Sequence, residues 1–169
     1  GFTWLFGANM VKANLQQANL ERTNLGRADL RQADLRDGDL SQSRADYANF
    51  QGASLTNARL TQACMRHGHF PRVDLSGADL SGADLRFADL TGANLTDANL
   101  TDANLCRAVL KDAQLQGANL TGAIVEYTDF ENVNLRSFEL SSLKGLDHAR
   151  LRGADLTGDD LIHLVFECQ

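Results

Sequence analysis

A hydrophobic residue recurs at every fifth position along most of the chain, and this spacing constrains the fold more than any other feature. From Leu5 to Leu140 there are 28 such positions, of which 21 are Leu, 3 are Phe, 2 are Met, one is Val125 and one is Ala45. The residue two positions earlier is Ala in 19 of the 28 pentads, and the residue between is usually Asn or Asp. A five-residue unit therefore has to be explained before any local motif.

A period of five fits neither regular element of secondary structure. On an α-helix, successive leucines would lie about 140° apart and form no stripe. On a flat strand they would alternate between faces, because five is odd. If each pentad points Ala and Leu inward and turns a corner with its last two residues, four corners close a square coil of about 20 residues. Such coils would stack as parallel strands about 4.8 Å apart around a solid core.

A 20-residue coil predicts that residues 20 apart lie on one face. We number the faces one to four from the inward residues Leu5, Met10, Leu15 and Leu20. On faces three and four the central residue is Leu at all fourteen positions. The departures from Leu fall only on faces one and two, and they are Ala45, Met65 and Val125 on the first and Met10, Phe50, Phe70 and Phe130 on the second. Only a four-sided coil accounts for this segregation.

The tandem stretches "GADLSGADL" and "ANLTDANL" resemble the pentapeptide-repeat family. The resemblance covers residues 3–140 and 146–156, and it implies a right-handed quadrilateral β-helix. We therefore predict an all-β fold, a right-handed quadrilateral β-helix (solenoid) over residues 1–156 with about seven to eight coils of four pentads each. The single proline, Pro71, falls at a corner, where its fixed φ is tolerated.

The C-terminal end departs from the pentad pattern. After Leu140 the leucines change phase, to positions 146, 151 and 156. Residues 157–169 begin with a threonine N-cap and two aspartates, and then place Leu161, Leu164 and Val165 at helical spacing. We predict a short C-terminal capping helix, and the alternative is one further pentad through Leu161 and Phe166. The family resemblance implies that this end can also pair two rods, so the same apolar residues are candidate cap or homodimer contacts.

Two corner residues follow each inward residue of face one, and the second of them forms the most distinctive outward pattern. Its members on successive coils, which we call the face-one column, are Arg27, Tyr47, His67, Phe87, Arg107 and Tyr127. Cationic and aromatic groups at the spacing of stacked coils attract one another. One interpretation is a ladder that stabilises the rod. The other is a partner-binding stripe, because exposed apolar groups gathered in one patch mark contact surfaces.

A filled convex rod offers no concave pocket, and so we expect no enzyme activity, metal or cofactor. Cys64, His67 and His69 have a spacing that resembles a metal site, but they fall on two faces and lack a fourth ligand. Asp46, His67 and Cys106 share face one as a nucleophile triad would, but the cysteine would lie two coils, about 10 Å, from the histidine.

Composition bounds the remaining possibilities. Three scattered cysteines predict reduced thiols and a cytoplasmic location. No apolar run of about 18 residues would span a bilayer. Because position 1 is Gly1, we expect a fragment or a processed chain. Residues 1–72 carry a net charge of +3 and residues 73–169 a net charge of −9, which disfavours direct nucleic-acid binding.

The family resemblance implies two different roles. Some members mimic DNA, bind gyrase or topoisomerase IV and protect against quinolones, and the acidic half of this chain suits that role. Others are rigid binding or spacer modules without an established activity. Here the acids of residues 73–140 are spread over all four faces. We therefore predict a non-enzymatic scaffold that binds a protein partner, with DNA mimicry as the alternative.

Overall fold

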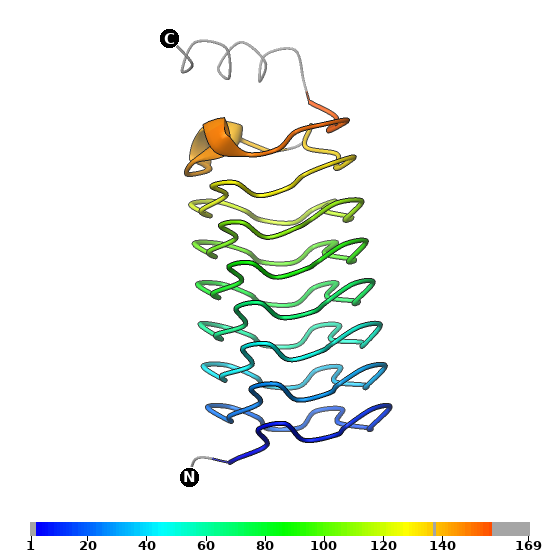
Figure 1. Cartoon of the computed structure of the whole chain (residues 1–169). Coiled ribbons are helices and arrows are strands. Elements are labelled where there is room, and N and C mark those ends of the chain that lie inside the picture. Colours follow the sequence, from blue (N-terminus) through cyan, green and yellow to red (C-terminus); the bar gives the residue numbers. More distant parts are fainter. Residues whose placement is uncertain (1–2, 137, 157–169) are drawn as a thin grey trace.

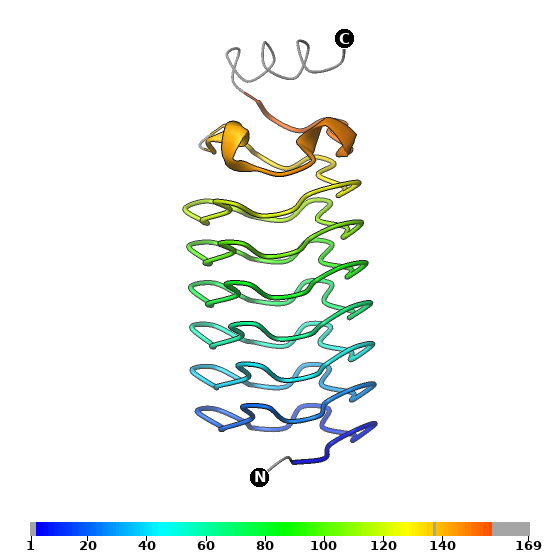
Figure 2. The same ribbon diagram turned by 90° about the vertical axis from the view of Figure 1, so that its left-hand side faces the viewer.

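The computed structural model describes residues 3–136 and 138–156, which wind into a four-sided rod (Figure 1). The residue between the two inward positions of a pentad forms a parallel β-bridge with the residue 20 positions later in every pentad from Trp4, which pairs with Asn24, to Val109, which pairs with Asp129, and again between Ile124 and Lys144. The described residues contain these single-residue bridges and no longer strand or α-helix, because each pentad spends two residues on a corner. The predicted parallel stacking is therefore confirmed, in a form reduced to one bridge per face (Figure 2).

Each corner is a tight turn with its own hydrogen bonds. The amide of Ala8 donates to the carbonyl of Leu5 at 3.0 Å, and later pentads repeat this bond. The second corner residue has a positive φ at all 26 corners from position 7 to position 132, and 19 of these residues are not glycine. The Asp or Asn side chain accepts from the amide two residues later, as Asp39 does from Ser41 at 2.9 Å. These carboxylates and amides thus stabilise the corners, as expected of such residues at turns.

The inward residues fill the rod completely. Leu95 in the middle of the rod has no exposed surface, and the interior rings of Phe50 and Phe70 stack with centroids 4.9 Å apart. The inward residue five positions before each interior phenylalanine is not Leu. The three pairs are Ala45 with Phe50, Met65 with Phe70, and Val125 with Phe130. We interpret this pairing as volume compensation within one coil, since interiors are packed without voids.

The last described coil contains two short 3₁₀ helices, η1 (Leu140–Ser142) and η2 (Leu146–His148). Here the bridge spacing increases from 20 to 21 residues, as in the bridge between Asp129 and Arg150. Gly145, with φ of 79°, precedes η2 and allows the chain to turn around the extra residue. The predicted change of phase after Leu140 is therefore confirmed.

The two ends of the rod differ in what can be described. The predicted capping helix and its candidate contacts Leu161, Leu164 and Val165 lie outside the described residues, so the helix and the homodimer stay predictions. At the opposite end Trp4 and Phe6 have 74% and 58% of their surface exposed. No helix among the described residues is both long enough and apolar enough to cross a membrane.

Candidate functional site

The six residues of the face-one column lie one above another along a single corner of the rod. They occupy the same position in coils that are held in register by the bridges between residues 20 apart. The rings of Tyr47 and His67 are parallel within 1°, with centroids 4.8 Å apart. The rings of His67 and Phe87 are parallel within 6°, with centroids 4.7 Å apart. The predicted column is therefore a continuous aromatic stack in its central part.

Arginine side chains cover the faces of the rings that other rings leave open. The guanidinium carbon of Arg27 lies 6.0 Å from the centroid of Tyr47. Arg107 lies between two rings, 5.8 Å from the centroid of Phe87 and 5.0 Å from that of Tyr127. Distances of about 6 Å or less are typical of cation–π attraction. The column thus has one arginine before its central stack of three rings and a second between Phe87 and Tyr127.

The structure adds one residue to the column that the sequence pattern did not predict. The ring of His148 lies 5.3 Å from that of Tyr127 and is tilted by 52°. Its Nδ1 is 2.9 Å from a carboxylate oxygen of Asp147, which holds the ring in place. A strict 20-residue step from Tyr127 leads to Asp147 instead. The phase change after Leu140 was the signal that would have identified His148.

The column carries large side chains in a backbone conformation that favours glycine. Its six residues have φ between 55° and 61°, a region disfavoured for residues with a Cβ. The same turn position is glycine at Gly7, one coil before Arg27 on this corner, and at glycines on each of the other three corners, such as Gly52, Gly77 and Gly82. Tyr47, Phe87 and Tyr127 nevertheless remain 56%, 45% and 47% exposed. Bulky rings are therefore retained at this corner and presented to solvent.

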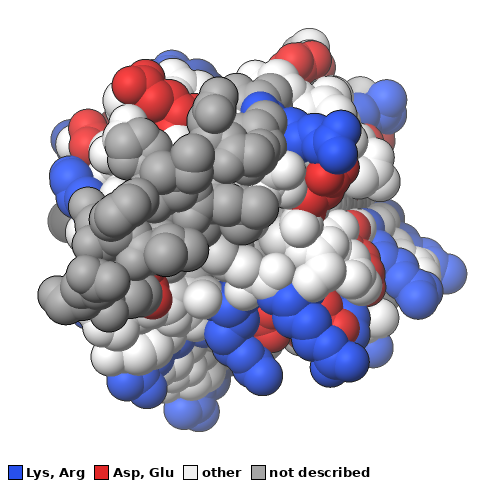
Figure 3. All heavy atoms as spheres, turned by 90° about the horizontal axis from the view of Figure 1, so that it is seen from above, with Lys and Arg blue, Asp and Glu red and all other residues white. Residues whose placement is uncertain are grey.

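The charges beside the column are unevenly neutralised. Arg66 Nε lies 3.0 Å from Asp46, and a nitrogen of Arg86 lies 2.7 Å from Asp84. Burial raises the pKa of Asp84, but hydrogen bonds from the side chain and amide of Arg86 outweigh it, so that the pKa is lowered. Figure 3 shows the same close mixing of acidic and basic side chains around the end of the rod.

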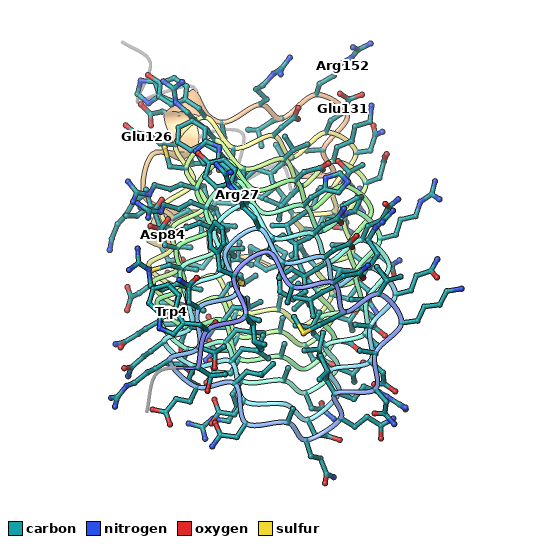
Figure 4. All side chains as sticks on the ribbon, turned by 60° about the horizontal axis from the view of Figure 1, so that its bottom comes forward. Trp4, Arg27, Asp84, Glu126, Glu131 and Arg152 are labelled. Carbon is teal, nitrogen blue, oxygen red and sulfur yellow. The ribbon has the colours of Figure 1, made fainter. Side chains whose placement is uncertain are left out.

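The two arginines within the column are different. Among the described residues, neither Arg27 nor Arg107 forms an ion pair with a carboxylate. In Figure 4, Arg27 lies on the same side of the coils as Asp84 and Glu126, while Glu131 lies on another side. The column therefore presents two arginines that form no direct ion pair with a carboxylate of the described residues.

The spacing of Cys64, His67 and His69 resembles that of a metal site. His67 is stacked within the column. His69 lies on face two, where its Nδ1 is 3.3 Å from a carboxylate oxygen of Asp89 on the same face. In the described part of the chain, no three His, Cys, Asp or Glu side chains are grouped closely enough to hold a metal ion. The structure therefore does not assemble this set.

The alternative triad of Asp46, His67 and Cys106 is not assembled either. The carboxylate of Asp46 accepts two hydrogen bonds from the side chain of Arg66, at 3.0 and 3.1 Å. His67 lies with its ring between those of Tyr47 and Phe87. The carboxylate is thus bound to a cation, and the imidazole is part of the stack.

Comparisons with known proteins agree with this architecture. A family model described as "Pentapeptide repeats" matches residues 5–37, 39–70, 65–97 and 98–136, with 8 copies. The crystal structure of a pentapeptide repeat protein from the Arabidopsis thaliana thylakoid lumen is 38% identical over 59% of this chain and 69% of that chain, with a TM-score of 0.57. None of the curated proteins compared with the sequence matches it.

Two further solved structures are less similar in shape. A pentapeptide repeat protein from Nostoc PCC 7120 is 32% identical over 79% of this chain and 84% of that chain, with a TM-score of 0.40. QnrB1, a plasmid-mediated fluoroquinolone resistance protein, is 15% identical over 99% of this chain and 98% of that chain, with a TM-score of 0.41. At that identity the likeness to QnrB1 carries no information on function.

Proposed function

Because the chain belongs to the pentapeptide repeat family, we propose that it is a rigid, non-enzymatic protein-interaction scaffold. The face-one column is its contact surface. The similarity to other pentapeptide repeat proteins implies that the rod is a right-handed β-helix. The observation that carries this proposal is the alignment of three half-exposed aromatic side chains, Tyr47, Phe87 and Tyr127, along one corner. Exposed apolar groups that gather in one patch are typical of contact surfaces.

The composition and rigidity of the column both support a role in binding. Tyrosine and arginine are enriched among the residues that dominate interface energies. The column is built on a backbone in which every coil is hydrogen bonded to the next. For example, the amide of Leu25 donates to the carbonyl of Arg44 at 2.7 Å. A surface that is already ordered loses little conformational entropy when it binds.

The test replaces Tyr47, Phe87 and Tyr127 with Ser, which removes the rings and leaves the inward residues unchanged. We expect the folded triple variant, checked by circular dichroism, to lose capture of its partner from an extract of its own cells. The matched control replaces three polar residues at the same turn position on other corners, Gln32, Asn57 and Gln62, with Ser. If the aromatic variant captures the same proteins as the wild type, the column is not the contact surface.

DNA mimicry is the weaker candidate, favoured by the net charge of −9 in residues 73–169. The acids of this half are interspersed with bases, as in the pairs of Lys111 with Glu131 at 3.0 Å and Arg136 with Asp155 at 2.6 Å, and those of residues 73–140 are spread over all four faces. The test is inhibition of bacterial gyrase supercoiling at low and at higher salt. Potent, salt-sensitive inhibition would favour mimicry over the scaffold, whereas no inhibition at micromolar protein would exclude it.

A further inference from the structure

We propose that the face-one column binds an extended acidic segment of a partner protein, laid parallel to the rod axis. The proposal rests on the function proposed above, because it names the chemistry of the partner for the same surface. Four properties of the column lead to it: the covered ring faces, the exposed ring edges, the two arginines that form no ion pair among the described residues, and the distance between those arginines.

The ring faces are not available to a ligand. Tyr47 is covered by Arg27 on one side and His67 on the other, and Phe87 is covered by His67 and Arg107. A planar group could enter only by separating coils that are held together by backbone hydrogen bonds, such as that from the Tyr47 amide to the Arg66 carbonyl at 2.9 Å. The column therefore cannot recognise nucleobases or sugar rings by stacking, as single-strand binding proteins do.

What the column exposes is the edges of its rings. Stacking along the rod axis turns the planes of Tyr47, His67 and Phe87 across the axis, so their outer edges face solvent. The edge of an aromatic ring is the positive end of its quadrupole, and it attracts carboxylate and carbonyl oxygens. The edges can thus contact both the apolar side chains and the backbone carbonyl oxygens of an extended partner segment.

The charge of the column selects an anionic partner. Arg66 and Arg86 beside the column are paired with Asp46 and Asp84. Arg27 and Arg107, which form no ion pair among the described residues, retain donors that bind carboxylates strongly. The chain as a whole has a net charge of −6, which opposes binding of a highly charged polyanion such as a nucleic acid. A short segment with two acidic residues satisfies both conditions.

The distance between the two arginines sets the register. Their positions differ by four coils, which at about 4.8 Å per coil is about 19 Å. An extended chain rises about 3.3 Å per residue, so that six residues span about 20 Å. Residues i and i+6 point to the same side of an extended chain, and so do i+2 and i+4 between them. The recognised pattern is therefore acidic–x–apolar–x–apolar–x–acidic, with the apolar side chains against Tyr47, His67 and Phe87.

The experiment measures binding of the peptide acetyl-Glu-Ser-Leu-Ser-Leu-Ser-Glu-amide to the whole chain by isothermal titration calorimetry. A peptide of the same composition, acetyl-Leu-Ser-Leu-Ser-Ser-Glu-Glu-amide, controls for charge without the spacing. We expect the first peptide to bind several-fold more tightly, and its affinity to fall as salt is added. Equal affinity for the two peptides would refute the register.

Substitutions test the assignment to particular residues. Arg27→Gln and Arg107→Gln are each expected to weaken binding about three- to fivefold, the most that an exposed ion pair contributes. Arg72→Gln is the matched control, because Arg72 is also exposed and occupies the same turn position on the next corner. An equal loss in the Arg72 variant would mean nonspecific attraction and would overturn the proposal.

The two proposals fail in different ways. If the peptide does not bind at millimolar concentration, or if an oligothymidylate of similar length binds as tightly, the acidic-segment proposal is wrong. The serine triple variant then decides separately whether the column contacts any protein. Loss of capture in that variant with no peptide binding would retain the contact surface and reject the acidic segment.

Discussion

Replacing Ala45 by Leu is the sharpest test of how the core accommodates its phenylalanines. Ala45 is 1% exposed and Phe50, at the next inward position of the same coil, is fully buried. The three added carbons have no free volume, and overpacking of this kind costs about 1–3 kcal/mol of stability. The protein should therefore be destabilised although the change restores the leucine of the repeat pattern.

The double variant Ala45→Leu/Phe50→Leu should recover part of that loss. Phe50→Leu alone removes the ring stacked on Phe70, an interaction that contributes about 0.5–1.5 kcal/mol beyond burial, and leaves a cavity. In the double variant the leucine at position 45 can occupy the space that the ring leaves. We expect the double variant to be about 1–2 kcal/mol more stable than the sum of the single changes predicts.

Equilibrium urea unfolding, followed by circular dichroism, measures these differences. Because a solenoid can unfold in segments, the free energies are compared only where all variants show one transition with the same slope. The control is Ala45→Leu combined with Phe130→Leu, whose positions are about four coils apart and should be additive within about 0.5 kcal/mol. Additivity in the Phe50 pair as well would refute volume compensation.

Three further predictions concern the core, the charges and the corners. Leu95→Asp would bury an unpaired charge and lower the free energy of unfolding by about 3–5 kcal/mol, and a wild-type melting temperature would show that position 95 does not point inward. The lowered pKa of Asp84 in the folded state contributes stability above its ordinary pKa of about 3.9, and this is lost as the pH falls through the lower folded value. Urea unfolding should therefore show stability falling below about pH 4, and Asp84→Asn, which cannot titrate, should flatten the fall; an identical profile in the variant would contradict the role of Arg86. Gly117→Ala, at φ of 70°, should lower the melting temperature more than Gly7→Ala, at φ of 65°, because only the first added methyl meets a neighbouring carboxylate, and equal effects would count against that contact.

The inward residues and the corners were predictable because one period governs both. Alternation of Ala and Leu with two corner residues leaves a single way to bury every apolar group, and Leu25 to Leu110 are buried as this requires. The face-one column was predictable for the same reason, since Tyr47 and Phe87 occupy equivalent positions in the repeat. Its contact role depends on a partner and stays a prediction.

Other features depend on geometry that the repeat does not specify. The single-residue bridges follow from how much backbone a corner uses, which only the folded chain shows. His148 lies beside Tyr127 because the chain has one extra residue near η2. The 20-residue repeat alone would place Asp147 there. The net charge of residues 73–169 does not show where the acids lie, and only the folded chain shows that some of them pair between neighbouring coils, as Glu131 does with Lys111.

The bridges between residues 20 apart also determine which changes of length the surface can tolerate. An insertion of five residues would leave the interior pattern intact but move every later side chain one corner around the rod. Tyr127 would then no longer follow Arg107, and the column would be divided between two corners. An insertion of a whole coil would keep each residue above its former neighbour and only lengthen the column. Duplication in units of one coil therefore preserves the face-one column, whereas duplication of one pentad preserves only the fold.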